Sequence, residues 1–115
     1  MNKFIHYPRC STCVKAKNVI EGKIPFEERD IKLDKLSFDE LKEIYNKSNL
    51  PIKRLINTSG LLYKEYKLKD KIPNMTDDEI LELLSTDGML VKRPILIIED
   101  KVLIGFKEEE YLKVI

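Results

Sequence analysis

The chain has 115 residues, of which 43% are hydrophobic; by length this is one domain, with enough apolar side chains for one compact core. Its 21 Lys and Arg nearly balance 20 Asp and Glu, so charge gives no overall attraction to nucleic acid or to an anionic membrane. No apolar run approaches the ~20 residues of a membrane-spanning helix, and the polar start lacks a signal-peptide core. We therefore expect a single cytoplasmic domain over residues 1–115, with no direct nucleic-acid or membrane partner.

The first thirty residues predict a strand, a helix and a second strand. The apolar run at residues 3–7 is typical of a buried strand, and the helical pattern that follows runs to about Glu21. Gly22 and Pro25 end this helix. Residues 26–31 predict the second strand, although its centre is polar. A unit of this length indicates parallel strands joined by a right-handed crossover.

A helical insert is predicted over residues of about 36–86. Ser37 and Thr76 are each followed three residues later by a glutamate, and these two capping boxes predict helix starts. Pro51 predicts a short helix between them, and Asp87-Gly88 is expected to end the last helix of the insert. The run at 63–71 interleaves aromatic residues with lysines, but its acidic residues favour a solvated helix face over a nucleic-acid patch.

The last part of the chain predicts a hairpin and a final helix. Residues 95–98 form a continuous apolar run typical of a central strand, and a tight connection leads to residues 102–104. Tyr111 and Leu112 lie on an amphipathic helix. The order is β-α-β, a helical insert and then β-β-α. With a Cys-x-x-Cys motif after the first strand, this predicts an α/β thioredoxin-like fold.

Both cysteines, Cys10 and Cys13, lie at the predicted junction of the first strand and helix. Residues three apart share one helix face, with Cβ atoms roughly 5–6 Å apart, so a small adjustment permits a disulfide. The first cysteine occupies the helix cap, where free N–H groups and the helix dipole stabilise a thiolate. Arg9 and Lys15 add positive charge. We expect Cys10 to be the nucleophile and the more shielded Cys13 to resolve a mixed disulfide.

Two alternatives to a redox pair exist for the same residues. A structural zinc ion needs four Cys or His ligands, and His6 is the single histidine, so no metal site is expected. Two inert, partly buried thiols are the second alternative, because free cysteine is often a small core residue. Thiols in the cytoplasm are kept reduced, which favours a catalytic or sensing pair over a structural disulfide bond.

Four segments carry a resemblance to a known family: YPRCSTC at 7–13, LINTSG at 55–60, DGMLVKRPI at 87–95 and GFKEE at 105–109. Over nearly its whole length the chain resembles the ArsC/Spx family, the arsenate-reductase-like branch of the thioredoxin/glutaredoxin fold. The resemblance implies that Cys10 is the nucleophile and that Pro94 is cis. It also implies that Arg93 faces the cysteine, where a guanidinium stabilises a thiolate or binds an oxyanion bidentately.

The candidate site therefore has a catalytic set and a supporting set. The catalytic residues are Cys10, Cys13 and Arg93. For His6 two roles stay open: it tunes the thiol, as the resemblance implies, or it is an ordinary strand histidine with its own partners. The supporting residues are Arg9, Ser11, Thr12, Pro94 and His6.

The resemblance implies three functions, in order of preference. The first is a thiol–disulfide oxidoreductase that acts on disulfide or thiol substrates, holds no bound cofactor, and takes electrons from glutathione or a thioredoxin/glutaredoxin system. The second is an Spx-like redox-sensing regulator that binds the RNA polymerase α subunit, although residues 47–51 lack the glycine of the Spx contact loop. The third is arsenate reduction. Family reductases use three arginines, of which Arg93 matches one; the others fall near Asn57 and near Gly105 or Phe106.

Overall fold

The computed structural model describes all residues 1–115 and is built on one four-stranded sheet of order β2-β1-β3-β4. Strand β1 (Lys3–His6) pairs in parallel with β2 (Glu27–Asp30) and antiparallel with β3 (Ile95–Ile98). Strand β4 (Lys101–Ile104) completes the antiparallel hairpin with β3. Helix α1 (Ser11–Ile20) connects the parallel pair. This is the predicted thioredoxin-like α/β fold, with β-α-β and β-β-α halves sharing one sheet.

The polar centre of β2 follows from its place at the edge of the sheet. Glu27 and Glu28 are exposed and Arg29 is half-buried, whereas β1 and β3 lie inside the sheet and are largely buried. An edge strand has a solvent side, so charged side chains there are tolerated and protect the free edge from pairing with another chain.

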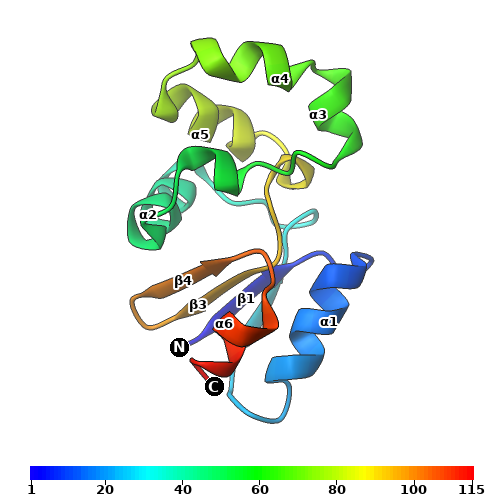
Figure 1. Cartoon of the computed structure of the whole chain (residues 1–115), viewed down its shortest axis with the longest axis vertical. Helices are drawn as coiled ribbons and strands as arrows, with labels where there is room; N and C mark the ends of the chain where they lie inside the picture. Colours follow the sequence, from blue (N-terminus) through cyan, green and yellow to red (C-terminus); the bar gives the residue numbers. More distant parts are fainter.

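The two faces of the sheet carry cores of different size. Successive strand residues point to opposite faces, so Phe4 and Leu96 join a small core under α1 and α6 (Glu108–Leu112), while Ile5 and Ile95 join the other side. The small core has five buried residues and the other has sixteen. Figure 1 shows α1 and α6 beside the sheet, and the remaining helices gathered at the opposite end of the long axis.

Those remaining helices form the insert between β2 and β3. Helix α2 packs against α5, and both begin with the predicted capping boxes, at Ser37 with Glu40 and at Thr76 with Glu79. None of the helices has the length and hydropathy that a bilayer crossing requires. The elements of the insert are α2 (Phe38–Ser48), η1 (Ile52–Leu55), α3 (Leu61–Glu65), α4 (Leu68–Lys71), η2 (Ile72–Asn74), α5 (Asp77–Ser85) and η3 (Gly88–Leu90).

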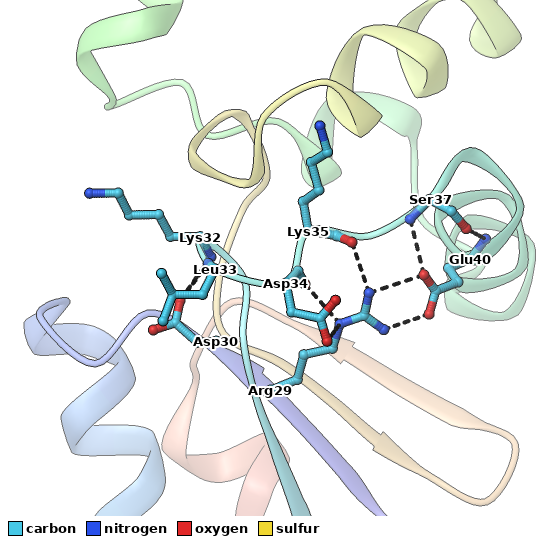
Figure 2. A network of polar contacts seen from close by, with 8 residues as sticks. All are labelled: Arg29, Asp30, Lys32, Leu33, Asp34, Lys35, Ser37 and Glu40. Atoms are coloured by element: carbon cyan, nitrogen blue, oxygen red, sulfur yellow. Dashed lines mark hydrogen bonds and ion pairs between the residues drawn. The ribbon is translucent and has the colours of Figure 1, made fainter.

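Arg29 ties this insert to the sheet (Figure 2). Its guanidinium makes two hydrogen bonds to the carboxylate of Glu40 on α2 and donates to the backbone carbonyls of Asp34 and Lys35, at 2.9 and 2.8 Å. Glu40 is also the glutamate of the capping box at Ser37. One arginine of the edge strand therefore fixes the start of α2.

Two local predictions differ from the structure. The run at 63–71 is not one helix face, because Lys67 adopts a left-handed conformation (φ 53°) and separates α3 from α4, whose Leu68 is buried. The Asp87-Gly88 pair does not end α5, which stops at Ser85; instead the Asp87 side chain caps η3. Gly88 is required there because a Cβ would lie 1.9 Å from the carbonyl oxygen of Ile31.

Candidate functional site

Cys10 occupies the N-cap of α1, four positions after the last residue of β1. Its backbone N–H donates to the Tyr7 carbonyl at 2.9 Å, and its own carbonyl accepts from Val14 at 3.0 Å, which starts the helix. The neutral side chain makes no capping hydrogen bond. The N–H groups of the first turn therefore remain available to a thiolate.

The surroundings of Cys10 lower the pKa of its thiol. Burial opposes ionisation, but it is outweighed by hydrogen bonds from the backbone N–H and thiol of Cys13, by the charge of Arg93, and by the backbone N–H of Thr12. These groups stabilise the thiolate as predicted from the helix cap. Cys10 is partly exposed, so the sulfur remains accessible.

Cys13 lies one turn further into α1 and is fully buried. The pKa of its thiol is raised to about 12, first by burial and then by the neighbouring Cys10, through the hydrogen bond that Cys13 donates and through charge repulsion; the backbone of Tyr7 and the charge of Arg93 oppose this shift. The two cysteines are free thiols in this structure. Two adjacent thiols thus have pKa values shifted in opposite directions, one accessible and one shielded.

Arg93 stands beside Cys10, and its charge acts on the pKa of both thiols. The Arg93–Pro94 peptide bond is cis, as the resemblance implies. The guanidinium lies over the ring of Tyr7, 5.3 Å from its centroid, and Nη1 makes a long 3.5 Å contact to the Met89 carbonyl. Its buried Nε has no acceptor, and no carboxylate pairs with the side chain. The positive charge is therefore uncompensated.

A hollow of about 260 Å³ opens at Cys10 between α1 and the insert. The insert is fixed there by a bridge between Ile56 and Val91, and by the Asn57 N–H donating to the Leu90 carbonyl at 2.8 Å. None of the lining residues is acidic, aliphatic or aromatic. They are Cys10, Thr12, Asn57, Ser59, Gly60, Lys92 and Arg93.

The predicted supporting residues are distributed unevenly around this hollow. Thr12 lines it, while Arg9 and Ser11 are exposed and are not among its lining residues. Pro94 is buried, and its carbonyl accepts from the Gly105 N–H at 2.8 Å. Its role is structural: it holds the segment next to the hollow.

His6 belongs to a different cluster on the sheet. Its Nε2 lies 3.2 Å from Glu28 Oε1, which also pairs with Lys17 at 2.8 Å. Burial lowers the pKa of His6 despite the nearby glutamate. Of the two roles left open, the structure favours the ordinary strand histidine, although its partner is a side chain and not the backbone.

Four lining residues were not predicted as site residues: Asn57, Ser59, Gly60 and Lys92. All four lie inside the segments that carry the resemblance. Lys92 is a cation next to Arg93, which was the available signal. Asn57 and Gly105, near the positions where family reductases place further arginines, are neutral here, and Asn57 donates its side-chain amide to the Met89 carbonyl at 3.2 Å.

The sheet order and the cysteine at the head of α1 define a thioredoxin-like protein of the arsenate-reductase type. The ArsC family model matches residues 5–114, so the chain belongs to the ArsC family.

Three similar proteins illustrate the range of this family. The uncharacterized protein YusI of Bacillus subtilis is 47% identical over 110 residues, covering 94% of this chain and 92% of YusI. The global transcriptional regulator Spx of Bacillus subtilis is 32% identical over 104 residues, covering 90% of this chain and 78% of Spx. The crystal structure of an ArsC-family-related protein from Bacteroides fragilis has a TM-score of 0.93 at 49% identity, covering 97% of this chain and 95% of that one.

Proposed function

We propose that this protein is a thiol–disulfide oxidoreductase in which Cys10 is the nucleophile and Cys13 the resolving thiol. The observation that carries the proposal is the opposite shift of the two thiol pKa values at the head of α1, lowered for Cys10 and raised to about 12 for Cys13. A lowered pKa increases the fraction of thiolate at neutral pH, and the thiolate is the reactive form. A shielded second thiol stays protonated until it is needed.

In the first step the Cys10 thiolate attacks one sulfur of a substrate disulfide. A bond forms between Cys10 Sγ and that sulfur, the substrate S–S bond breaks, and its electron pair leaves with the second sulfur as a thiolate, which takes a proton from water. The uncompensated guanidinium of Arg93 and the N–H groups of α1 stabilise the attacking thiolate before this step.

In the second step Cys13 loses its proton to solvent and attacks Cys10 Sγ. The Cys10–Cys13 disulfide forms, the mixed disulfide breaks, and the captured thiol leaves as its thiolate. Once Cys10 carries a substrate it is no longer an anion, so its charge no longer raises the pKa of Cys13. Capture therefore activates the resolving thiol. Overall, one substrate disulfide is reduced to two thiols and the protein dithiol is oxidised.

Turnover requires a second thiol to reduce the protein disulfide. We assign this role to glutathione or to a thioredoxin/glutaredoxin system in the cytoplasm, with no bound cofactor. Either donor attacks one sulfur of the Cys10–Cys13 bond and leaves as its own disulfide after a second exchange, which returns both cysteines to the dithiol state.

The direct test uses a mixed disulfide of glutathione with a model peptide. Reduced wild type should release glutathione and end as the intramolecular disulfide, which mass spectrometry after thiol alkylation detects. Cys10→Ser should lose at least about a thousandfold in rate, because the partly exposed nucleophile is removed. Equal rates for the two proteins would remove the proposal.

A second candidate is a redox-sensing regulator, favoured by the 32% identity to Spx. In that case the thiol pair would control binding to the C-terminal domain of the RNA polymerase α subunit. A pull-down with that domain should then depend on whether the pair is reduced or oxidised. Absence of binding in both states would exclude the regulator and leave the oxidoreductase as the proposed function.

Arsenate reduction ranks third, because Arg93 has no second arginine beside it among the residues that line the hollow. Each missing charge-assisted contact to an oxyanion is worth ~1.5–3 kcal/mol. The reaction would appear as arsenate-dependent oxidation of a thiol donor that requires Cys10.

A further inference from the structure

Two cations line the hollow at Cys10, and neither has an acidic partner. Arg93 is half-buried and Lys92 is exposed, and no carboxylate lies within ion-pair distance of either. Elsewhere Lys17, Arg29 and Lys47 are each paired with a glutamate. The hollow is thus a positively charged site with no acidic lining residue.

Lys92 lines this hollow, and its backbone and side chain each have one close neighbour outside it. Its N–H donates to the Leu55 carbonyl at 2.7 Å, directly after the bridge between Ile56 and Val91. Its Cε lies 3.3 Å from the point where a Cβ on Gly105 would stand, so the side chain passes across that glycine. Arg93 is the inner cation of the site, next to the sulfur, and Lys92 is the solvent-exposed one.

We infer that Lys92 is a specificity-determining residue that selects small acidic thiols, by binding a carboxylate of the molecule whose sulfur is attached to Cys10. The inference rests on the proposed oxidoreductase function. The volume of about 260 Å³ lies just below the ~300–1,000 Å³ of drug-sized sites, which favours a low-molecular-weight thiol over a protein segment. The lining is mostly polar: it offers hydrogen-bonding groups and positive charge, and it contains no aliphatic or aromatic side chain.

The division of work between the two cations follows from their positions. Arg93 stabilises the Cys10 thiolate before the attack, whatever the substrate carries. Lys92 contributes only when the substrate brings a negative charge to the outer part of the hollow. Removing Lys92 should therefore change selectivity among disulfides of different charge, and should leave the intrinsic reactivity of Cys10 unchanged.

The test compares three symmetrical disulfides: glutathione disulfide (anionic), hydroxyethyl disulfide (neutral) and cystamine (cationic). The second-order rate of mixed-disulfide formation at Cys10 is measured by intact mass on the full-length protein with Cys13→Ser in the background, which retains the mixed disulfide. For each probe the rate of the Lys92→Gln protein is divided by that of its parent, which cancels the inherent reactivity of the probe.

We expect Lys92→Gln to slow the reaction with glutathione disulfide about three- to tenfold and to change the rate with hydroxyethyl disulfide by less than about twofold. The reaction with cystamine should become faster. Lys92→Glu should slow the reaction with glutathione disulfide more strongly than Lys92→Gln does, and should speed the reaction with cystamine more. Raising the ionic strength should shrink the effect, because exposed charges are screened. Lys69→Gln is the matched control: Lys69 is exposed on α4 and does not line the hollow, so the same loss of charge should leave all three rates unchanged.

Equal slowing of all three probes would overturn the inference, because it would indicate a general effect on Cys10. An unchanged glutathione disulfide rate would also overturn it. The disulfide of an acidic cysteine peptide serves as a fourth probe. If Lys92→Gln slowed only the reaction with this peptide, the occupant would be a polypeptide and the small-thiol assignment would be wrong. A parent protein that reacts with none of the disulfides would instead refute the proposed function itself.

Discussion

Two of the hollows in the molecule differ in how their basic residues are paired as well as in size. The larger, about 550 Å³, lies between α2 and the sheet and is lined by six acidic and three basic residues among others. Two of its three basic residues are paired within it: Arg29 with Glu40 and Asp34 (Figure 2), and Lys47 with Glu43. The network of Arg29 holds α2 to the sheet, and the charge of this arginine is already satisfied by protein groups.

The smaller hollow, at Cys10, is about 260 Å³ and its charges are unpaired. Arg93 has a buried Nε without an acceptor, and Lys92 has no carboxylate near it. A buried polar group left without a partner costs stability, so the unpartnered Nε of Arg93 is most easily explained if a substrate or reaction intermediate supplies its partner. The proposed chemistry therefore lies at the hollow with the unpaired cations, although the other hollow is larger.

The largest expected effect is on the resolving step at the smaller hollow. In Cys13→Ser the mixed disulfide with glutathione should persist, with release slowed at least about a thousandfold, because the internal nucleophile is gone. In wild type, release should accelerate as pH rises through the neutral range. The pKa of Cys13 is raised to about 12 in the dithiol form, so only a small fraction is thiolate at pH 7. Stopped-flow release of glutathione would measure both, and a pH-independent rate would contradict the assignment.

Disrupting the network of Arg29 at the larger hollow should lower the stability of the fold and leave the reactivity of Cys10 unchanged. Arg29→Met removes the hydrogen bonds to Glu40, Asp34 and Lys35, and we expect a loss of about 2 kcal/mol in the free energy of unfolding. Urea denaturation measures this loss. Lys42→Met is the matched control, since its pair with Asp78 is largely exposed and should contribute under about 1 kcal/mol. A shift in the reactivity of Cys10 in the Arg29 variant would break the contrast between the two hollows.

The same network predicts an acid limit to stability. The hydrogen bond from Arg29 lowers the pKa of Glu40 from 4.5 to about 2. A carboxyl whose pKa is lower in the folded state stabilises the fold above its unfolded pKa, and this contribution is lost as pH falls from about 4.5 to about 2. Because the Glu40 side chain is 43% exposed, we discount the effect to about 1–2 kcal/mol. The loss should be absent in Glu40→Gln, measured by denaturation across that pH window.

A smaller effect is expected on the ionisation of Cys10. Arg93→Gln should raise the pKa of the thiol, because the charge of Arg93 is one of the groups that lower it. Alkylation by iodoacetamide near neutral pH should slow by about tenfold or less, and Arg93→Lys should restore much of the rate. Arg29→Met, the same loss of charge at the larger hollow, should not change it. An unshifted pH profile in Arg93→Gln would mean that the helix N-terminus alone stabilises the thiolate.

Most of the fold was predictable because its signals are local. The strand at residues 3–7, the helix ending before Gly22, both capping boxes and the final hairpin each depend on residues within one or two turns of each other. The two errors are of different kinds. Gly88 is required by a distant contact, the carbonyl of Ile31 more than fifty positions away, whereas Lys67 adopts a left-handed conformation that breaks a helix favoured by its sequence pattern.

The site was predictable for the same reason, and only in part. Cys10 and Cys13 are defined by their own helix cap. The partner of His6 could not be predicted in this way. Glu28 comes from a neighbouring strand, and the pairing of edge residues does not follow from the sequence. Lys92 was missed because alternation predicts that neighbours on an extended segment point apart, whereas Lys92 and Arg93 line the same hollow before the cis proline.

The smallest expected effect concerns the other buried group that lacks a partner. The Tyr111 hydroxyl is buried in the small core under α1 and makes no hydrogen bond. The Tyr111 ring packs edge-on against the ring of Phe106, with 4.9 Å between the ring centroids. Burial and the nearby Cys13 raise the pKa of this hydroxyl, so it is neutral. Tyr111→Phe keeps the ring and removes the unsatisfied group, and should stabilise the protein by up to about 1 kcal/mol in thermal denaturation. Tyr111→Leu, which also loses the ring contact, should destabilise it. If Tyr111→Phe were instead destabilising and also slowed release of glutathione from Cys10, the hydroxyl would be a hydrogen-bond donor to the Cys13 thiolate, and the unpaired groups on this side of the sheet would all serve the same reaction.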